Sequence, residues 1–249
     1  MENVVLGLVL LITLLVFLTV LPDRIIRKQN FKCYVINLPK NADRLTNFRL
    51  NYSHSELADT PLVIIEGVNG KALGPAIKKY VTPEVAQGME HVERTGTRPS
   101  EAFLTAGAIG CYLSHYKTWE TILDGTDPYG IVFEDDAAID ARVYSKGVRP
   151  AFEELGSDWD VILLGNIFTY GQDDTEKIER VKHFWGLQGY IISRRGCEKL
   201  MKYRDDKISK QIDGFLSSLA QDGVVDIYAV RPSLIGQTGY GTDIQVPIV

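Results

Sequence analysis

The sequence contains little cysteine, no basic blocks and no internal repeat. Its three cysteines, Cys33, Cys111 and Cys197, are too few for a disulfide framework or for a four-cysteine zinc site. Lysines and arginines number 27 against 32 aspartates and glutamates, so the net charge of −5 argues against a general nucleic-acid binder. With 45% hydrophobic and 24% charged residues in 249, the chain is expected to fold into a globular body rather than to be disordered.

One segment departs from this average composition. Residues 4–21 are uncharged and almost all Val, Leu, Ile or Phe. As a helix they would span roughly 27 Å, close to the hydrocarbon thickness of a bilayer. A cleavable signal peptide is the alternative, but no charged region precedes the segment and no small-residue cleavage site follows it. We therefore predict one membrane-spanning helix within residues 1–30, followed by a single folded domain over residues 31–249.

The charges next to this segment favour one orientation. Four basic residues follow it closely, and only Glu2 precedes it: Arg24, Arg27, Lys28 and Lys32. By the positive-inside rule, the folded domain is expected in the cytoplasm.

Beyond residue 31, short apolar runs alternate with helix-like stretches. Strands are expected at residues 33–38, 62–66, 130–134, 161–164, 190–193 and 225–230. Helices are expected at residues 42–57, 105–123, 144–155, 195–203 and 210–220. This alternation predicts an α/β layered domain with a mixed, mainly parallel sheet. Residues 82–103 lack clear periodicity and residues 171–179 are acidic, so both are expected to be loops.

Three consecutive carboxylates, Glu134, Asp135 and Asp136, follow one of the apolar strands. Ligands of open α/β sheets bind beyond the carboxyl ends of the strands. Adjacent negative charges repel unless a positive charge lies among them, and Mn²⁺ or Mg²⁺ with oxygen ligands would supply it. Strand alternation predicts that Glu134 and Asp136 point to one side and share the metal, while Asp135 points to the other. An exposed acidic turn is the alternative.

The expected helix at 105–123 carries a second group of candidate residues. One of its faces consists of small residues: Gly107, Gly110, Cys111, Ser114 and Thr118. Such a face lets a backbone or a flat ligand approach closely. Cys111 and His115 lie one turn apart, and are interpreted as core residues because no further metal ligand is near in the sequence. Arg44, near the start of the first helix, could bind an anion or lie at the surface.

In this order, these segments resemble glycosyltransferase family 25, which includes bacterial lipopolysaccharide galactosyltransferases and procollagen hydroxylysine galactosyltransferases. The resemblance covers residues 31–245 and rests on seven blocks: residues 34–38 with Arg44, 68–71, 110–115 with Trp119, 134–136, 189–193, 212–216 and 232–244.

The resemblance implies a GT-A-type fold and a glycosyltransferase domain over residues 31–249. It further implies a UDP-galactose or UDP-glucose donor, metal-assisted transfer with inversion, and a glycan, lipopolysaccharide or hydroxylysine-type acceptor. It assigns Glu134 and Asp136 to the metal, with Asp135 nearer the ribose, and Asp213 to the acceptor. It assigns to the nucleotide site Asn37, Leu38, Arg44, Asn69, Gly70 and Ser114.

Two further residues complete the candidate site. Asp213 is the candidate catalytic base, because Ile212 and Phe215 beside it could desolvate its carboxylate; capping of the following helix is the alternative. Asp243 follows a glycine-flanked turn that could bring it back towards the metal.

Two other functions remain open. Ala108 stands where the family usually has glutamate, so the chain could be a catalytically impaired, membrane-anchored binding protein on the same scaffold. The carboxylates could also serve a metal-dependent phosphoryl transferase or nuclease, although the acidic charge disfavours a nucleic-acid substrate.

Overall fold

The computed structural model describes residues 31–248 except for 101, 174–176, 205 and 240–243. The expected membrane span at residues 4–21 and the candidate ligand Asp243 lie outside the described residues. None of the described helices is long and apolar enough to cross a bilayer. From Lys32 onward the chain forms one compact unit.

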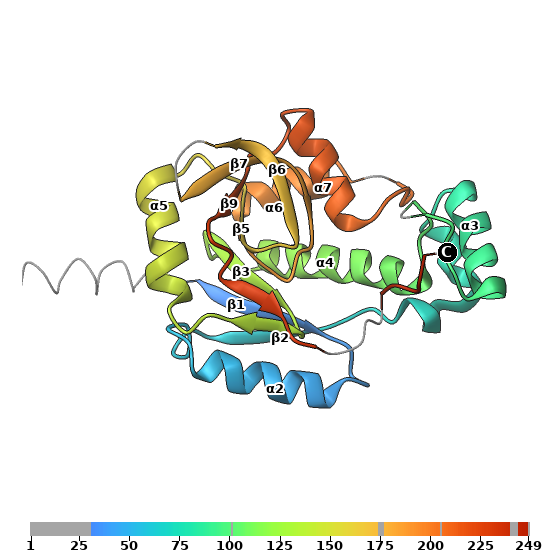
Figure 1. Ribbon diagram of the computed structural model, residues 1–249, viewed down its shortest axis with the longest axis horizontal. Helices are drawn as coiled ribbons and strands as arrows, with labels where there is room; N and C mark the ends of the chain where they lie inside the picture. The colour runs from blue at the N-terminus through green and yellow to red at the C-terminus, as the bar shows by residue number, and fades with distance from the viewer. Residues whose placement is uncertain (1–30, 101, 174–176, 205, 240–243, 249) are drawn as a thin grey trace, which may run out of the picture. The chain divides into compact units, whose positions relative to one another are not determined.

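Eight of the described strands form one mixed sheet (Figure 1). Their order across the sheet is β2 (Leu62–Glu66), β1 (Lys32–Asn37), β3 (Tyr129–Glu134), β8 (Gly189–Ser193), β5 (Val161–Gly165), β9 (Ile227–Val230), β7 (Ile178–Trp185) and β6 (Phe168–Asp173). Only β8 and β7 run against the other described strands of the sheet. The predicted mixed, mainly parallel sheet is therefore confirmed.

Helices cover both faces of this sheet, as strand β5 and the first five residues of β3, all buried, require. One face carries α4 (Ala106–Asp124), α6 (Arg194–Lys202) and α7 (Ile212–Gln221), whose apolar side chains join those of the strands in one core. The other carries α2 (Ala42–Ser53), which lies below β1 and β2 in Figure 1, and α5 (Arg149–Leu155). Phe48 of α2 contacts Phe133 of β3, and Phe152 of α5 contacts Tyr129.

The remaining elements are short. A 3₁₀ segment, η1 (Gly70–Lys79), follows β2, and a π-helical turn, η2 (Tyr144–Val148), precedes α5. The helix expected at residues 144–155 is therefore divided. Strands β4 (Ala137–Ile139) and β10 (Ile235–Gln237) pair antiparallel as a separate two-stranded sheet.

The expected loop at residues 82–103 is wrong, because α3 (Pro83–Thr95) occupies most of it. The signals for this helix are local. Thr82 Oγ1 accepts a hydrogen bond from Val85 N, Pro83 fills the first helical position, and Gly96 ends the helix with φ of 72°.

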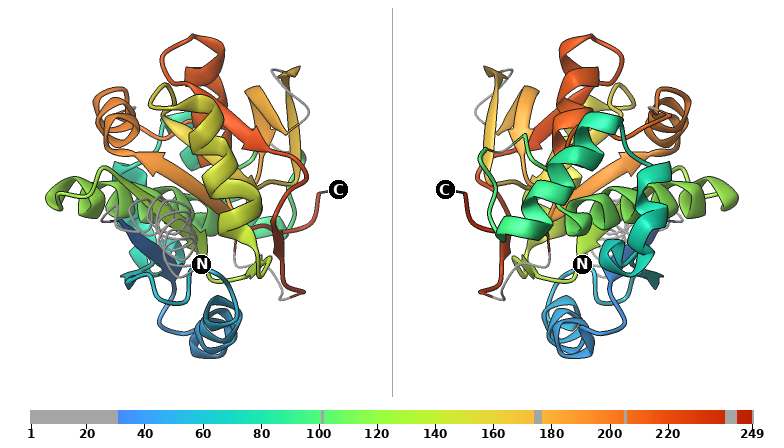
Figure 2. Two further views of the ribbon diagram at one scale, coloured as in Figure 1. Left: turned by 90° about the vertical axis from the view of Figure 1, so that its left-hand side faces the viewer. Right: turned by 90° about the vertical axis from the view of Figure 1, so that its right-hand side faces the viewer.

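The expected solvated loop at residues 171–179 is also wrong. Residues 171–173 belong to β6, and residues 178 and 179 belong to β7. These two paired strands lie at one end of the sheet (Figure 2). Glu179 is only 2% exposed, and its Oε2 lies 2.7 Å from Nη2 of Arg231 and accepts a hydrogen bond from Thr169 Oγ1. The sequence alone predicts that an acidic residue is exposed, because the cation that pairs with it can lie far away in the chain.

Candidate active site

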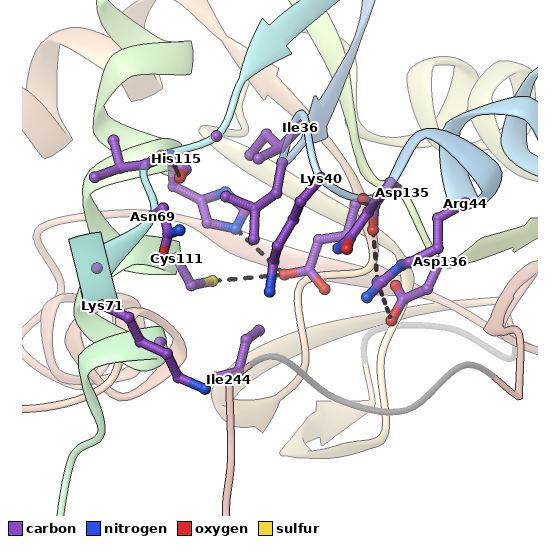
Figure 3. A pocket seen from close by; sticks show the side chains of 18 residues that line it. Ile36, Lys40, Arg44, Asn69, Lys71, Cys111, His115, Asp135, Asp136 and Ile244 are labelled. Atoms are coloured by element: carbon purple, nitrogen blue, oxygen red, sulfur yellow. Dashed lines mark hydrogen bonds and ion pairs between the residues drawn. The ribbon is translucent and has the colours of Figure 1, made fainter. Parts of the chain in front are cut away.

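The parallel strands β1, β2 and β3 end at one edge of the sheet, so the segments that follow them meet there. Together with one side of α4 they enclose a cavity of about 90 Å³, named here the nucleotide-edge cavity after the nucleotide site expected from the sequence (Figure 3). Three cationic side chains, Lys40, Arg44 and Lys71, reach it from different segments. Its other polar lining comprises Asn41, Asn69, Ser114, His115, Glu134, Asp135 and Asp136.

The small-residue face of α4 allows the turn after β2 to lie directly on the helix. A Cβ on Gly110 would come within 2.4 Å of the Val68 carbonyl oxygen, and a Cβ on Gly70 within 1.7 Å of the Ala106 carbonyl oxygen. Ser114 Oγ accepts a hydrogen bond from Val68 N at 2.8 Å. The close approach of a backbone, expected from the sequence, is confirmed, and it forms one wall of the cavity.

The acidic cluster does not follow strand alternation. β3 ends at Glu134, and Asp135 and Asp136 form the turn that follows. Both aspartates therefore reach the same guanidinium, with Arg44 Nη2 at 2.5 Å from Asp135 Oδ1 and 3.1 Å from Asp136 Oδ2. The prediction that Asp135 points away from Asp136 is wrong, because it extended strand alternation past Glu134, where the strand ends as expected.

Glu134 instead turns towards α4. Its Oε1 lies 3.4 Å from His115 Nε2 and accepts a hydrogen bond from the Cys111 thiol at 3.8 Å. The sequence interpretation that nothing accompanies Cys111 and His115 is wrong, since one oxygen of Glu134 and the two α4 side chains lie within 4.8 Å of one another. Burial, followed by the charge of Glu134, raises the pKa of the Cys111 thiol well above its ordinary value.

Asp136 combines burial with crowding by like charge. Burial first, and then the neighbouring Glu134 carboxylate, raises the pKa of Asp136 to about 7, although Arg44 acts in the opposite direction. Its Oδ1 is buried without a hydrogen-bond partner among the described residues. A buried, unpartnered carboxylate oxygen at a cavity wall is chemically suited to a cation.

A second cavity of about 590 Å³, named the acceptor-side cavity because it contains Asp213, which is expected from the sequence to face the acceptor, adjoins the first. Both are lined by Cys111, Glu134, Asp136 and Ile244. Its further lining includes Asp213, Trp185, Ile167 and three glutamines: Gln211, Gln237 and Gln245. The acidic cluster therefore lies at the wall between the two cavities.

Asp213 lies in the first turn of α7 and is 8% exposed. Its carboxylate accepts hydrogen bonds from Gly214 N at 2.8 Å and Gly186 N at 3.2 Å. Burial raises the pKa of Asp213, and these two donors oppose the shift. Ile212 lines the cavity beside it, whereas Phe215 packs inside the core.

The structure brings most predicted site residues to these two cavities. Leu38, Arg44, Asn69 and Gly70 line the nucleotide-edge cavity. Asn37 does not line it; its side-chain amide donates to Asp135 Oδ2 at 2.7 Å and so supports the acidic turn.

Several lining residues were not among the site residues predicted from the sequence. Lys40 lies in the turn after β1, and Lys71 lies at the start of η1, which follows β2. Trp185 and Ile244 reach the site from segments distant in the chain.

Ala108 has a structural explanation. It is the third residue of α4 after the cap Thr105, whose Oγ1 accepts its backbone N–H at 3.0 Å. A glutamate at this position typically completes a capping box. Ala108 is 5% exposed and is not among the residues that line either cavity, so the departure from the family pattern concerns the helix start.

A comparison with protein families decides the affiliation. Residues 30–216 match the model described as glycosyltransferase family 25 (LPS biosynthesis protein). The chain belongs to glycosyltransferase family 25. The resemblance predicted from the ordered blocks is thereby confirmed.

Curated relatives include procollagen galactosyltransferases and a member of the same family named as probable inactive. The chain is 26% identical to procollagen galactosyltransferase 1 of Danio rerio over 223 residues, covering 86% of this chain and 35% of the relative. It is 28% identical to procollagen galactosyltransferase 2 of Homo sapiens, covering 68% and 27%. It is also 24% identical to a protein of Bos taurus named probable inactive glycosyltransferase 25 family member 3, covering 84% and 37%. The chain thus spans about a third of the length of these relatives.

The similar solved structures share less sequence identity with this chain than the curated relatives do. One is UDP-glucose pyrophosphorylase complexed with UDP-glucose, with a TM-score of 0.41, 13% identity, and coverage of 83% of this chain and 91% of that one. Another is Staphylococcus aureus TarS, with a TM-score of 0.45, 11% identity, and coverage of 83% and 36%. These scores are too low to assign a fold.

Proposed function

We propose that the chain is a metal-dependent, inverting glycosyltransferase that moves galactose or glucose from a UDP-sugar to a glycan, lipopolysaccharide or hydroxylysine-type acceptor. The observation that carries the proposal is the acidic cluster at the wall between two cavities, with a buried carboxylate, Asp213, in the second. The GT-A-type fold is part of this proposal and is supported by a mixed sheet whose parallel strands end at the site.

The nucleotide-edge cavity is the proposed donor diphosphate site. Lys40 and Lys71 supply positive charge, while Asn69 and Gly70 form a turn against which a nucleotide can lie. A volume of about 90 Å³ is smaller than the roughly 300–1,000 Å³ typical of ligand sites. The donor must therefore extend past the acidic cluster, which brings its sugar into the acceptor-side cavity.

Glu134 and Asp136 would hold the metal, as expected from the sequence, because both line both cavities and the buried Asp136 Oδ1 has no partner among the described residues. Hard oxygen ligands of this kind suit Mn²⁺ or Mg²⁺. When bound, such a metal would neutralise the leaving diphosphate as a Lewis acid. Arg44 limits the repulsion within the cluster before any ligand binds.

Asp213 would act as the base. It would accept the proton of the acceptor hydroxyl as that oxygen bonds to the anomeric carbon of the sugar and UDP leaves. Its raised pKa makes it a stronger base than an exposed aspartate, and the hydrogen bonds from Gly186 and Gly214 fix its orientation. Trp185 offers a ring face on which the acceptor can stack in the same cavity.

Nucleotide release from a panel of nucleotide sugars tests the proposal. The full chain is incubated with Mn²⁺ and each donor, with and without candidate acceptors. We expect release of UDP from UDP-galactose or UDP-glucose, and its loss when the metal is chelated. Failure to bind UDP and to release it from any donor would refute the proposal.

One observation favours a second candidate function. Two of the relatives are named inactive or probable inactive members of the same family. A binding protein on this scaffold would retain metal-dependent UDP binding but release no UDP. The same assay therefore separates the two functions.

The membrane anchor remains a proposal. A single span at residues 4–21 with a cytoplasmic domain would place the enzyme at a membrane surface, and it rests on hydropathy and on the charges that follow the segment. Fractionation of the full chain with membranes, against a version lacking residues 1–30, tests it.

A further inference from the structure

Beneath the acidic cluster lies a buried chain of hydrogen bonds. Trp119 Nε1 lies 2.9 Å from Tyr190 Oη, and Tyr190 Oη lies 2.9 Å from His115 Nδ1. The other imidazole nitrogen, Nε2, lies 3.4 Å from Glu134 Oε1. The three rings are each 0% exposed. No solvent is therefore available to satisfy their polar atoms.

One arrangement of protons satisfies every polar atom in this row of hydrogen bonds. An indole nitrogen can only donate, so the Tyr190 oxygen accepts from Trp119. The hydroxyl proton of Tyr190 then needs its own acceptor, and among the described residues the remaining polar neighbour is His115 Nδ1. If Tyr190 donates to Nδ1, a neutral imidazole carries its proton on Nε2, where it faces the Glu134 carboxylate.

The opposite tautomer, with its proton on Nδ1, is unfavourable at both imidazole nitrogens. A proton on Nδ1 would leave the buried Tyr190 hydroxyl without an acceptor, at a cost of roughly 1–3 kcal/mol. It would also direct the Nε2 lone pair at a carboxylate oxygen. Both effects select the Nε2–H form.

We infer that Trp119 and Tyr190 fix His115 as the Nε2–H tautomer, and that His115 and Cys111 are positioning residues that hold the Glu134 carboxylate at the wall between the two cavities. Both donors reach the same oxygen, Oε1, from one face of α4 at a spacing of four residues. This leaves the other oxygen of Glu134 to serve a ligand. The inference rests on the proposed function only in that Glu134 acts on the metal or donor.

A metal held directly by Cys111, His115 and Glu134 is the competing arrangement, since their ligand atoms lie within 4.8 Å of one another. It requires a lone pair on His115 Nε2, and hence a proton on Nδ1. The two arrangements therefore predict opposite tautomers.

Nitrogen-15 NMR of the full chain with labelled histidine measures the tautomer directly. The sequence has four histidines, and the His115→Gln variant identifies the signals of His115. We expect a protonated Nε2 and an unprotonated Nδ1, unchanged by added Mn²⁺ or Zn²⁺. A protonated Nδ1, or loss of the Nε2 proton on metal addition, would overturn the inference.

Activity variants test the positioning role. His115→Leu removes the donor to Glu134 and should lower kcat by about 10- to 100-fold. His115→Gln keeps an N–H donor at the same reach and should restore most of the rate. His54→Gln, an exposed site outside both cavities, is the matched control. Equal activity in all three variants would contradict the role.

Tyr190→Phe keeps the inference testable if His115→Leu fails to fold. It retains the buried ring and removes only the hydroxyl, so the Nε2–H form loses one of its two supports, the ring is held less firmly against Glu134, and kcat should fall while Glu134 still favours that tautomer. An unchanged kcat would count against the role of these hydrogen bonds. If the wild type neither binds nor turns over UDP-sugars, the proposed function fails, whereas the tautomer result stands or falls independently.

Discussion

The three consecutive carboxylates after β3 divide between two partners. Asp135 and Asp136 share Arg44, whereas Glu134 accepts from Cys111 and lies against His115. The sequence predicted the position of this cluster, because a fully apolar strand ends in it. It could not predict the division, since that depends on the conformation of the turn after Glu134 and on partners 19 to 98 residues away in the chain.

Replacing Asp136 with asparagine should raise the melting temperature and at the same time weaken UDP binding. The raised pKa means that ionised Asp136 destabilises the folded chain, so the advantage of Asp136→Asn in melting temperature should grow as pH rises from about 3.8 to about 7 and level off above that. Manganese-dependent UDP binding should weaken at least about tenfold. Thermal melts and UDP titrations measure the two effects.

Asp158→Asn makes the same chemical change at an exposed site outside both cavities and is the matched control. The metal assignment of Asp136 would be wrong if both variants bound UDP with Mn²⁺ as the wild type does.

Asp213 predicts a pH dependence of the rate. A base must be ionised, and burial raises the pKa of Asp213, so activity should be lost on acidification at a higher pH than an exposed aspartate would give. Asp213→Asn should lower kcat by about 10²- to 10⁴-fold while leaving UDP binding intact. A pH–rate profile and a UDP titration measure these effects.

Asp222→Asn, exposed near the opposite end of α7, is the control for Asp213→Asn. A near wild-type rate in Asp213→Asn would leave only a capping role for this side chain.

At the scale of elements, the junction of α4 with the turn after β2 depends on glycine. Gly110→Ala would bring a Cβ within 2.4 Å of the Val68 carbonyl oxygen, and neither backbone can yield without moving the cavity wall. We expect a loss of about 1–3 kcal/mol in unfolding free energy, with weaker UDP binding. Denaturant unfolding measures the loss.

Gly214→Ala, within α7, provides the contrast for Gly110→Ala. Its Cβ would meet no atom closer than 3.9 Å, so this helical substitution should be neutral or stabilising by up to about 1 kcal/mol. Equal stability changes in the two variants would mean that close backbone approach does not explain Gly110.

Trp185 belongs to β7 and, unlike its neighbour Phe184, faces the acceptor-side cavity. Trp185→Ala should raise the KM for the acceptor roughly fivefold, corresponding to about 1 kcal/mol of ring stacking, and leave donor hydrolysis unchanged. Tyr170→Ala on the adjacent strand removes an aromatic ring that is 69% exposed and lines neither cavity. An equal effect of both variants would refute the stacking role.

The strand β7 was missed for a physical reason. Its buried apolar residues Val181 and Phe184 are three apart, because the pairing with β6 shifts register between Tyr170 and Gly171. A bulge of this kind breaks the alternation that identifies a strand. The regular strands β1, β2 and β3 were predicted to within a residue or two, because no such shift occurs where β1 pairs with β2 and β3.

At the scale of the whole molecule, the division of the site into adjoining cavities predicts how UDP and Mn²⁺ change the free energy of unfolding. Several carboxylates converge on one wall, so UDP alone would bring its diphosphate close to like charge, and Mn²⁺ alone would lack the diphosphate oxygens. UDP and Mn²⁺ together, at about 100 times the dissociation constant, should add about 2.7 kcal/mol of stability.

For a domain of this size, that corresponds to a rise of roughly 5–10 °C in melting temperature. Either ligand alone should give much less, and chelation should reverse the effect. Differential scanning fluorimetry of the full chain measures all four conditions, with Asp136→Asn as the variant in which the combined shift should fall to about half or less. If UDP alone gave the full shift in the wild type, the diphosphate would be held by Lys40, Lys71 and Arg44 without a metal, and the acidic wall would have another purpose.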